Sequence, residues 1–164
     1  MNQTQSFEIN NSDIFKKTLY SLIVVATPKT SDEYAWSSVK ILLKDLRTNY
    51  HFLKYVTIGQ LQNLSFTKDD ITISTSLNDV DSKEIGKALQ DLIDLLKKRL
   101  GNKAGYFFLQ EFKQVLGETY HQVIKEMGVD LRIIELQNKI YGVGKTDYAI
   151  KDTQDSNIAY IRKT

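Results

Sequence analysis

The sequence predicts an α+β fold: a single domain in which two helical hairpins pack on a small, mainly antiparallel β-sheet. Apolar residues recur at three- and four-residue spacing through long stretches, which is the period of an amphipathic helix. Between and after these stretches the period falls to two, which is typical of half-buried strands. A length of 164 residues fits one domain, with possible lobes at residues 7–78 and 79–164.

The first helical hairpin is predicted from residue 14 to residue 46. Ser12 or Asp13 is expected to cap a helix that runs to Ala26, and Pro28 ends it because proline cannot continue a helix. Ser31 caps the next helix, whose apolar face reaches Leu46.

The clearest helical signal begins at Asp81, which forms a capping-box pattern with Glu84. Gly101 lies where a left-handed helix cap is expected. The apolar residues of this helix fall on one face: Ile85, Ala88, Leu89, Leu92, Ile93, Leu96 and Leu100.

A second helical pattern follows from about residue 103 to Gly128, and Gly117 interrupts it. Glycine inside a helix costs about 1 kcal/mol relative to alanine, so we expect the helix to break there. Residues 129–136 are then predicted to form a strand.

The predicted sheet comes from residues whose apolar positions alternate. Residues 52–58, 61–66 and 71–77 suggest an antiparallel meander, and residues 139–143 and 148–151 suggest a later pair. The turn between the last two, residues 142–146, resembles a phosphate-binding loop. It lacks the first glycine of that motif and the helix that must follow, so a hairpin turn is the better interpretation.

Composition limits the classes of function. The sequence contains no cysteine, which excludes disulfides, cysteine nucleophiles and thiolate metal sites. A net charge of +2 gives no strong basic field for nucleic acid. The most apolar run, residues 19–26, is shorter than the roughly 20 residues that span a bilayer, so we expect no membrane span. The lack of cysteine fits a reducing compartment, so we expect a cytoplasmic location.

Polar motifs give little support for catalysis. Glu118 and His121 share a helix face, and with Lys145 they give a less favoured hypothesis, a small-ligand or phosphate-binding enzyme in which the three side chains converge in one pocket. A serine nucleophile elbow is absent, so we expect no catalytic residue, metal or cofactor.

A DNA-binding alternative rests on element order. Helices within residues 82–128, followed by strands within residues 129–150, match the order of a winged helix. The helix that would enter the major groove carries Glu118 and Glu126 against Lys125, which makes nucleic acid an unfavoured partner.

Aromatic residues give the favoured hypothesis. They surround more than one face of the second helical pattern, so they suggest either burial on two sides or an apolar surface for a partner. We predict a non-enzymatic regulatory or signalling module that contacts another protein or itself, most simply as a homodimer. The expected contact residues are Tyr106, Phe107, Phe108, Phe112 and Tyr120.

Overall fold

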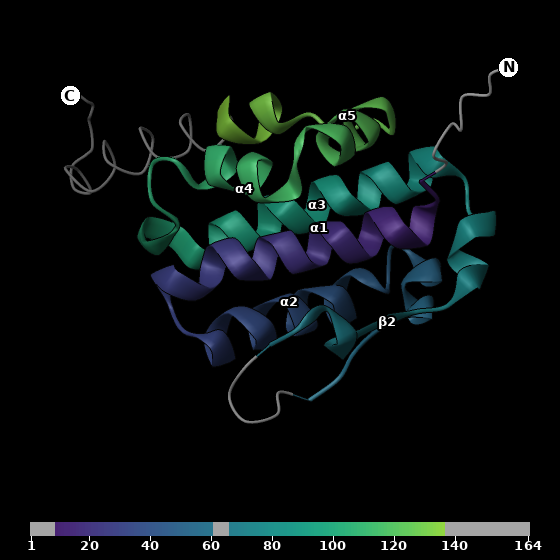
Figure 1. Cartoon of the computed structure of the whole chain (residues 1–164), viewed down its shortest axis with the longest axis horizontal. Helices are drawn as coiled ribbons and strands as arrows, with labels where there is room; N and C mark the ends of the chain where they lie inside the picture. The colour runs from purple at the N-terminus through teal and green to yellow at the C-terminus, as the bar shows by residue number, and fades with distance from the viewer. Residues whose placement is uncertain (1–8, 61–65, 137–164) are drawn as a thin grey trace, which may run out of the picture. The chain divides into compact units, whose positions relative to one another are not determined.

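The computed structural model describes residues 9–60 and 66–136. These residues are mostly helical, and their β structure is one two-stranded antiparallel sheet (Figure 1). The predicted α+β fold, with helical hairpins packed on a sheet, is therefore wrong. Residues up to Val129 form one compact part and residues from Asp130 belong to another, so each is described by itself. The single domain with two lobes stays a prediction.

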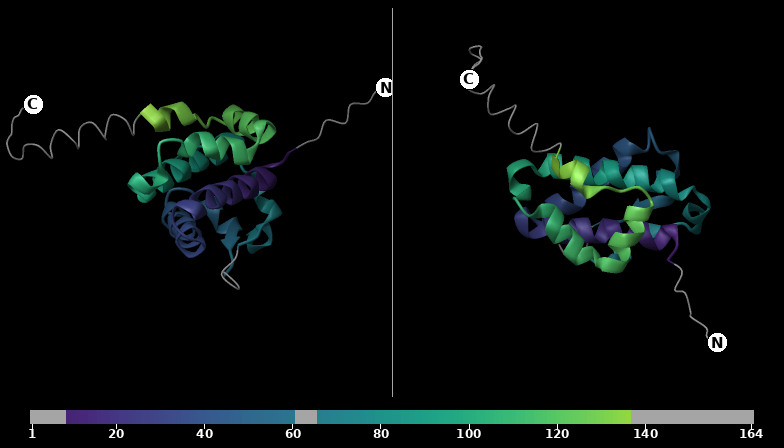
Figure 2. Two further views of the ribbon diagram at one scale, coloured as in Figure 1. Left: turned by 60° about the vertical axis from the view of Figure 1, so that its left-hand side comes forward. Right: turned by 90° about the horizontal axis from the view of Figure 1, so that it is seen from above.

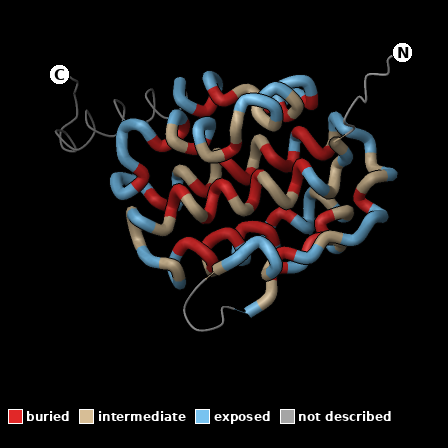
Figure 3. The backbone as a smooth tube through the Cα atoms, in the orientation of Figure 1, coloured by how far each residue is buried: buried red, intermediate tan, exposed pale blue. Residues whose placement is uncertain are grey.

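Helix α1 (Asn11–Ala26) lies at the centre of the first part. It contacts α2 (Asp32–Leu46), α3 (Ser82–Leu100) and α4 (Phe108–Leu116). Helices α1 and α3 lie side by side, and in the view of Figure 1 α4 lies above them and α2 below (Figures 1 and 2). Figure 3 shows buried residues along both central helices, and eight of the α3 residues are buried: Ile85, Gly86, Ala88, Leu89, Leu92, Ile93, Leu96 and Leu100. The predicted apolar face of α3 is confirmed.

The helix starts follow local capping chemistry. Ser31 caps α2 by accepting a hydrogen bond from the Tyr34 N–H, and Asp81 caps α3 by accepting one from the Lys83 N–H, as predicted. Helix α1 begins earlier than expected, because Asn10 rather than Ser12 or Asp13 provides the cap. The Asn11 side chain donates to the carbonyl oxygens of Leu77 and Val80, which ties the start of α1 to the turn before α3.

The second helical pattern divides at Gly117, as predicted. Gly117 has φ of 92°, a left-handed value that glycine adopts without a steric penalty, and it separates α4 from α5 (Glu118–Glu126). The start of the pattern was predicted too early. Residues Gly101–Ala104 form the short 3-10 turn η5, and α4 begins only at Phe108.

The sheet is shorter than predicted. Strands β1 (Val56–Ile58) and β2 (Ile71–Ile73) pair with Thr57 opposite Thr72. Before β1, residues His51–Tyr55 form the 3-10 turn η2, with Leu53 buried as its anchor. After β2, the Ser74 hydroxyl accepts from the Ser76 N–H and starts the 3-10 turn η4 (Thr75–Asp79), which ends the strand early. The second predicted strand, residues 61–66, lies outside the described residues except for Phe66.

The second part of the chain also departs from the prediction. Residues 131–136 are helical, whereas a strand was expected over residues 129–136. The physical reason lies at Asp130, whose carboxylate accepts a hydrogen bond from the Arg132 N–H at 2.9 Å, a contact typical of a helix start. The strands predicted within residues 139–151 lie outside the described residues.

Candidate interaction surface

One end of the helical core brings together the last turn of α3, the start of α2 and η5 (Figure 1). Arg99 donates from Nε to the buried Ser38 hydroxyl at 3.0 Å, and its guanidinium lies 5.9 Å from the centre of the Tyr34 ring. The Lys103 ammonium lies 5.8 Å from the same ring. These cation–π contacts hold η5 next to α2.

Tyr106 and Phe107 protrude from this end. Their side chains are 81% and 58% exposed, and the two rings pack edge to face with their centres 5.1 Å apart. Gly105, with φ of 82°, turns the chain just before them, and the Phe107 carbonyl accepts the Glu111 N–H of α4. The backbone on both sides of this aromatic pair is therefore fixed by the fold.

The next aromatic residues have the opposite environment. Phe108 and Phe112 have no exposed surface, because α4 begins at Phe108 and helical spacing directs both rings into the core beside α1. A partner cannot reach either ring in this structure. Tyr120 is half-buried on α5, with the Lys17 ammonium 5.8 Å from its ring centre. Of the predicted contact set, Tyr106 and Phe107 are the side chains that present a large apolar surface.

The predicted ligand residues are only partly described. Glu118 is exposed in the first turn of α5. His121 lies one turn later and is half-buried, and its backbone N–H donates to the Gly117 carbonyl. Lys145 lies outside the described residues, so the convergence of the three stays a prediction. In residues 9–60 and 66–136, no group of three His, Asp or Glu side chains is placed to hold a metal ion.

The winged-helix alternative loses part of its basis. Residues 131–136, which would have supplied the first strand of the wing, are helical. The remaining strands of that hypothesis lie beyond the described part of the chain.

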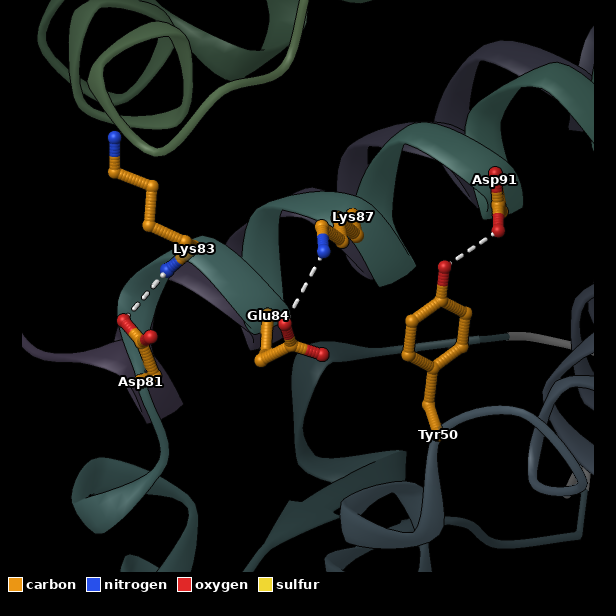
Figure 4. Close-up of polar contacts among 6 residues, drawn as sticks. All are labelled: Tyr50, Asp81, Lys83, Glu84, Lys87 and Asp91. Carbon is orange, nitrogen blue, oxygen red and sulfur yellow. Dashed lines mark hydrogen bonds and ion pairs between the residues drawn. The ribbon is translucent and has the colours of Figure 1, made fainter.

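No sequence pattern predicted the contact between Tyr50 and α3. The Tyr50 hydroxyl donates to the Asp91 carboxylate at 2.7 Å, and Figure 4 shows its ring pointing toward that residue. Burial, the hydrogen bond and the charge of Asp91 raise the pKa of Tyr50 to about 12. A phenol with this pKa stays protonated at neutral pH, so it anchors the turn after α2 rather than acting as a base.

A second surface feature lies between α2 and β1, and we name it the α2–β1 groove. It has a volume of about 150 Å³ and is lined by Lys40, Leu43, Lys44, Arg47, Val56, Thr57 and Ile58. The three cations follow each other at spacings of four and three residues, so the sequence did carry the signal of a basic helix face. The sequence could not show that strand β1 lies next to this basic face of α2.

No protein-family model, curated protein or solved structure matches this chain. Among the described residues, no helix combines the length and the apolar character needed to cross a bilayer.

Proposed function

We propose that this chain is a non-enzymatic interaction module that self-associates through the aromatic pair Tyr106 and Phe107. The observation that carries the proposal is the exposure of two adjacent aromatic rings, at 81% and 58%. Full burial of one such side chain is worth roughly 1.5–3 kcal/mol, which gives the pair a strong tendency to be covered.

The position of the pair favours a specific contact. Aromatic side chains are enriched among the few residues that dominate binding energy in protein interfaces. The edge-to-face packing of Tyr106 on Phe107, together with the fixed backbone on both sides, lowers the entropy lost on binding.

A second copy of the chain is the partner that we infer. A two-fold axis beside the pair would let each copy cover the other's rings with the same surface. The formal net charge of +2 adds little long-range repulsion between copies. The proposal retains the expected cytoplasmic location, with which a sequence free of cysteine is consistent.

Sedimentation velocity tests the proposal with the double variant Tyr106→Ser/Phe107→Ser. At roughly 50 μM, a concentration at which a weak specific pair associates, the wild type is expected to be a dimer and the variant a monomer. Because both residues are exposed in the single chain, the variant should unfold at nearly the same temperature as the wild type when both are diluted until they are monomeric.

Ile41→Ser is the matched control. Ile41 is another exposed apolar residue, at 43%, but it lies on α2 outside the aromatic pair, so this variant should remain a dimer. A wild type that stays monomeric, or a double variant that still dimerises, would contradict the proposal.

A further inference from the structure

We propose that the α2–β1 groove binds an extended, acidic segment of a partner protein, which adds alongside β1. This inference is independent of self-association through Tyr106 and Phe107. It rests on three features of the groove: cations that form no salt bridge with a carboxylate of the described residues, the backbone groups of Ile58 at the outer edge of β1, and an apolar floor.

The cations form one row along α2 and its C-terminal cap, Arg47. Lys40, Lys44 and Arg47 are all exposed, and seven residues of helix separate the first from the last by about 10 Å. In the described part of the chain, none of the three forms a salt bridge. By contrast, Lys29, Lys87 and Lys98 each pair with a carboxylate. The row therefore presents positive charge that an acidic ligand can neutralise.

The backbone of β1 supplies a second element of recognition. Tyr55 accepts from the Ser74 N–H and Gly59 donates to the Asp70 carbonyl, so this alternate set of backbone groups points toward β2. The groups of Val56 and Ile58 consequently point the other way, toward the groove.

On this outer edge the Val56 N–H already donates to the Leu53 carbonyl, whereas the N–H and the carbonyl of Ile58 have no hydrogen-bond partner among the described residues. Arg47 donates from Nη2 to the Val56 carbonyl at 3.3 Å, and within residues 9–60 and 66–136 no strand pairs there. An extended peptide can bind such an edge through its own main chain.

The floor of the groove is apolar. Leu43, Val56 and Ile58 are buried side chains that line it, while Thr57 and the cations form its rim. The groove volume of about 150 Å³ is the volume that roughly five water molecules occupy in the liquid. This volume suffices for one branched aliphatic side chain. The ligand that fits is thus a short peptide with acidic residues around a leucine or valine.

The length of the cation row distinguishes this ligand from a compact anion. A single phosphate group would contact only part of a row of about 10 Å, whereas three residues of extended chain, at about 3.3 Å each, cover all of it. The charge spacing therefore favours a peptide over a free anion.

Fluorescence anisotropy tests this with the labelled peptide Ser-Glu-Glu-Leu-Glu-Glu-Ser, added to the full chain at low salt. The wild type should bind it, and Lys40→Glu/Lys44→Glu should weaken binding about tenfold or more, because two attractive contacts become repulsive. The same peptide with glutamine in place of glutamate should not bind.

The matched control reverses the same number of charges elsewhere. Lys83→Glu/Lys113→Glu changes two exposed lysines on α3 and α4 and should bind the peptide within about twofold of the wild type. An equal loss in this control would show only general attraction and would overturn the proposal.

Two further measurements separate the remaining outcomes. Amide exchange of Ile58 should slow when the peptide binds, since its backbone would gain a partner. Complete displacement of the peptide by millimolar inorganic phosphate would indicate a compact anion site and overturn the peptide assignment. Sedimentation of Lys40→Glu/Lys44→Glu should still give the wild-type assembly state, so the two proposals can fail separately.

Discussion

The two sides of α3 are stabilised by different kinds of contact. On its buried side, Gly86 lies so close to the backbone of Met127 that no side chain fits between them. On its polar side, Asp91 accepts the Tyr50 hydroxyl and Glu84 pairs with Lys87, all of them accessible to water to some degree (Figure 4). Close packing on one side leaves no room for adjustment, whereas water can replace a lost contact on the other. Substitutions on the two sides should therefore differ strongly in cost.

The largest effect is expected for Gly86→Ala. The added Cβ would lie 2.8 Å from the Met127 carbonyl carbon and closer still to its oxygen, and both atoms are backbone. Helix propensity would gain about 1 kcal/mol, but overpacking costs roughly 1–3 kcal/mol and more where backbone must move. We expect a net loss of about 2 kcal/mol in the free energy of unfolding, measured by urea denaturation.

Gly59→Ala is the control for this substitution. Its new Cβ would meet the Asp70 carbonyl oxygen at 3.6 Å, an ordinary contact, and Gly59 does not have a positive φ. This variant should change stability by less than about 1 kcal/mol. If Gly86→Ala were as stable as the wild type, α3 and the end of α5 could not lie as close as the structure has them.

An intermediate effect is expected for Tyr50→Phe on the polar side. The variant removes one hydrogen bond to a half-buried carboxylate, which water can then solvate, so we expect a loss of about 1 kcal/mol at pH 7. Tyr55→Phe provides the comparison, because the Tyr55 hydroxyl has no hydrogen-bond partner among the described contacts, and it should cost less.

The effect of Tyr50 should also depend on pH. Its pKa is raised from 10.0 to about 12 in the folded chain, so folding favours the protonated phenol. The corresponding stabilisation is complete below pH 10 and is lost as the pH rises through about 12. Denaturation between these pH values should show the wild type losing more stability than Tyr50→Phe. Parallel curves for the two proteins would contradict the raised pKa.

The sequence predicted the apolar face of α3 but not the two contacts of α3 discussed above, with Met127 and with Tyr50. Helical spacing identified the face that carries Leu89 and Leu92, because periodicity depends only on the helix itself. The approach of Gly86 to Met127 depends on how α5 crosses α3, and the contact of Tyr50 with Asp91 joins residues 41 positions apart. Local spacing carries no information on either.

The same limit explains the outcome for the candidate sites and the sheet. The sequence identified the run of aromatic residues as a candidate surface. Which of them are buried and which are exposed depended on whether α4 began at residue 103 or at Phe108. A shift of about one helical turn in the start of α4 changes which aromatic rings are buried in the core and which are exposed. Alternation over residues 71–77 likewise predicted a strand, whereas a local bond from the Ser76 N–H to the Ser74 hydroxyl ended it at Ile73.

The smallest effect is expected at the ion pairs of α3. Glu84 and Lys87 are 3.3 Å apart and their side chains are 47% and 67% exposed, so a double-mutant cycle should give a coupling below about 0.5 kcal/mol. Asp94 and Lys98 are 3.0 Å apart, and Asp94 is only 18% exposed, so their coupling should be larger and less sensitive to salt. If Glu84 and Lys87 proved the more strongly coupled pair, exposure to water would not be what weakens contacts on the polar side of α3. The contrast between the two sides would then need another physical cause.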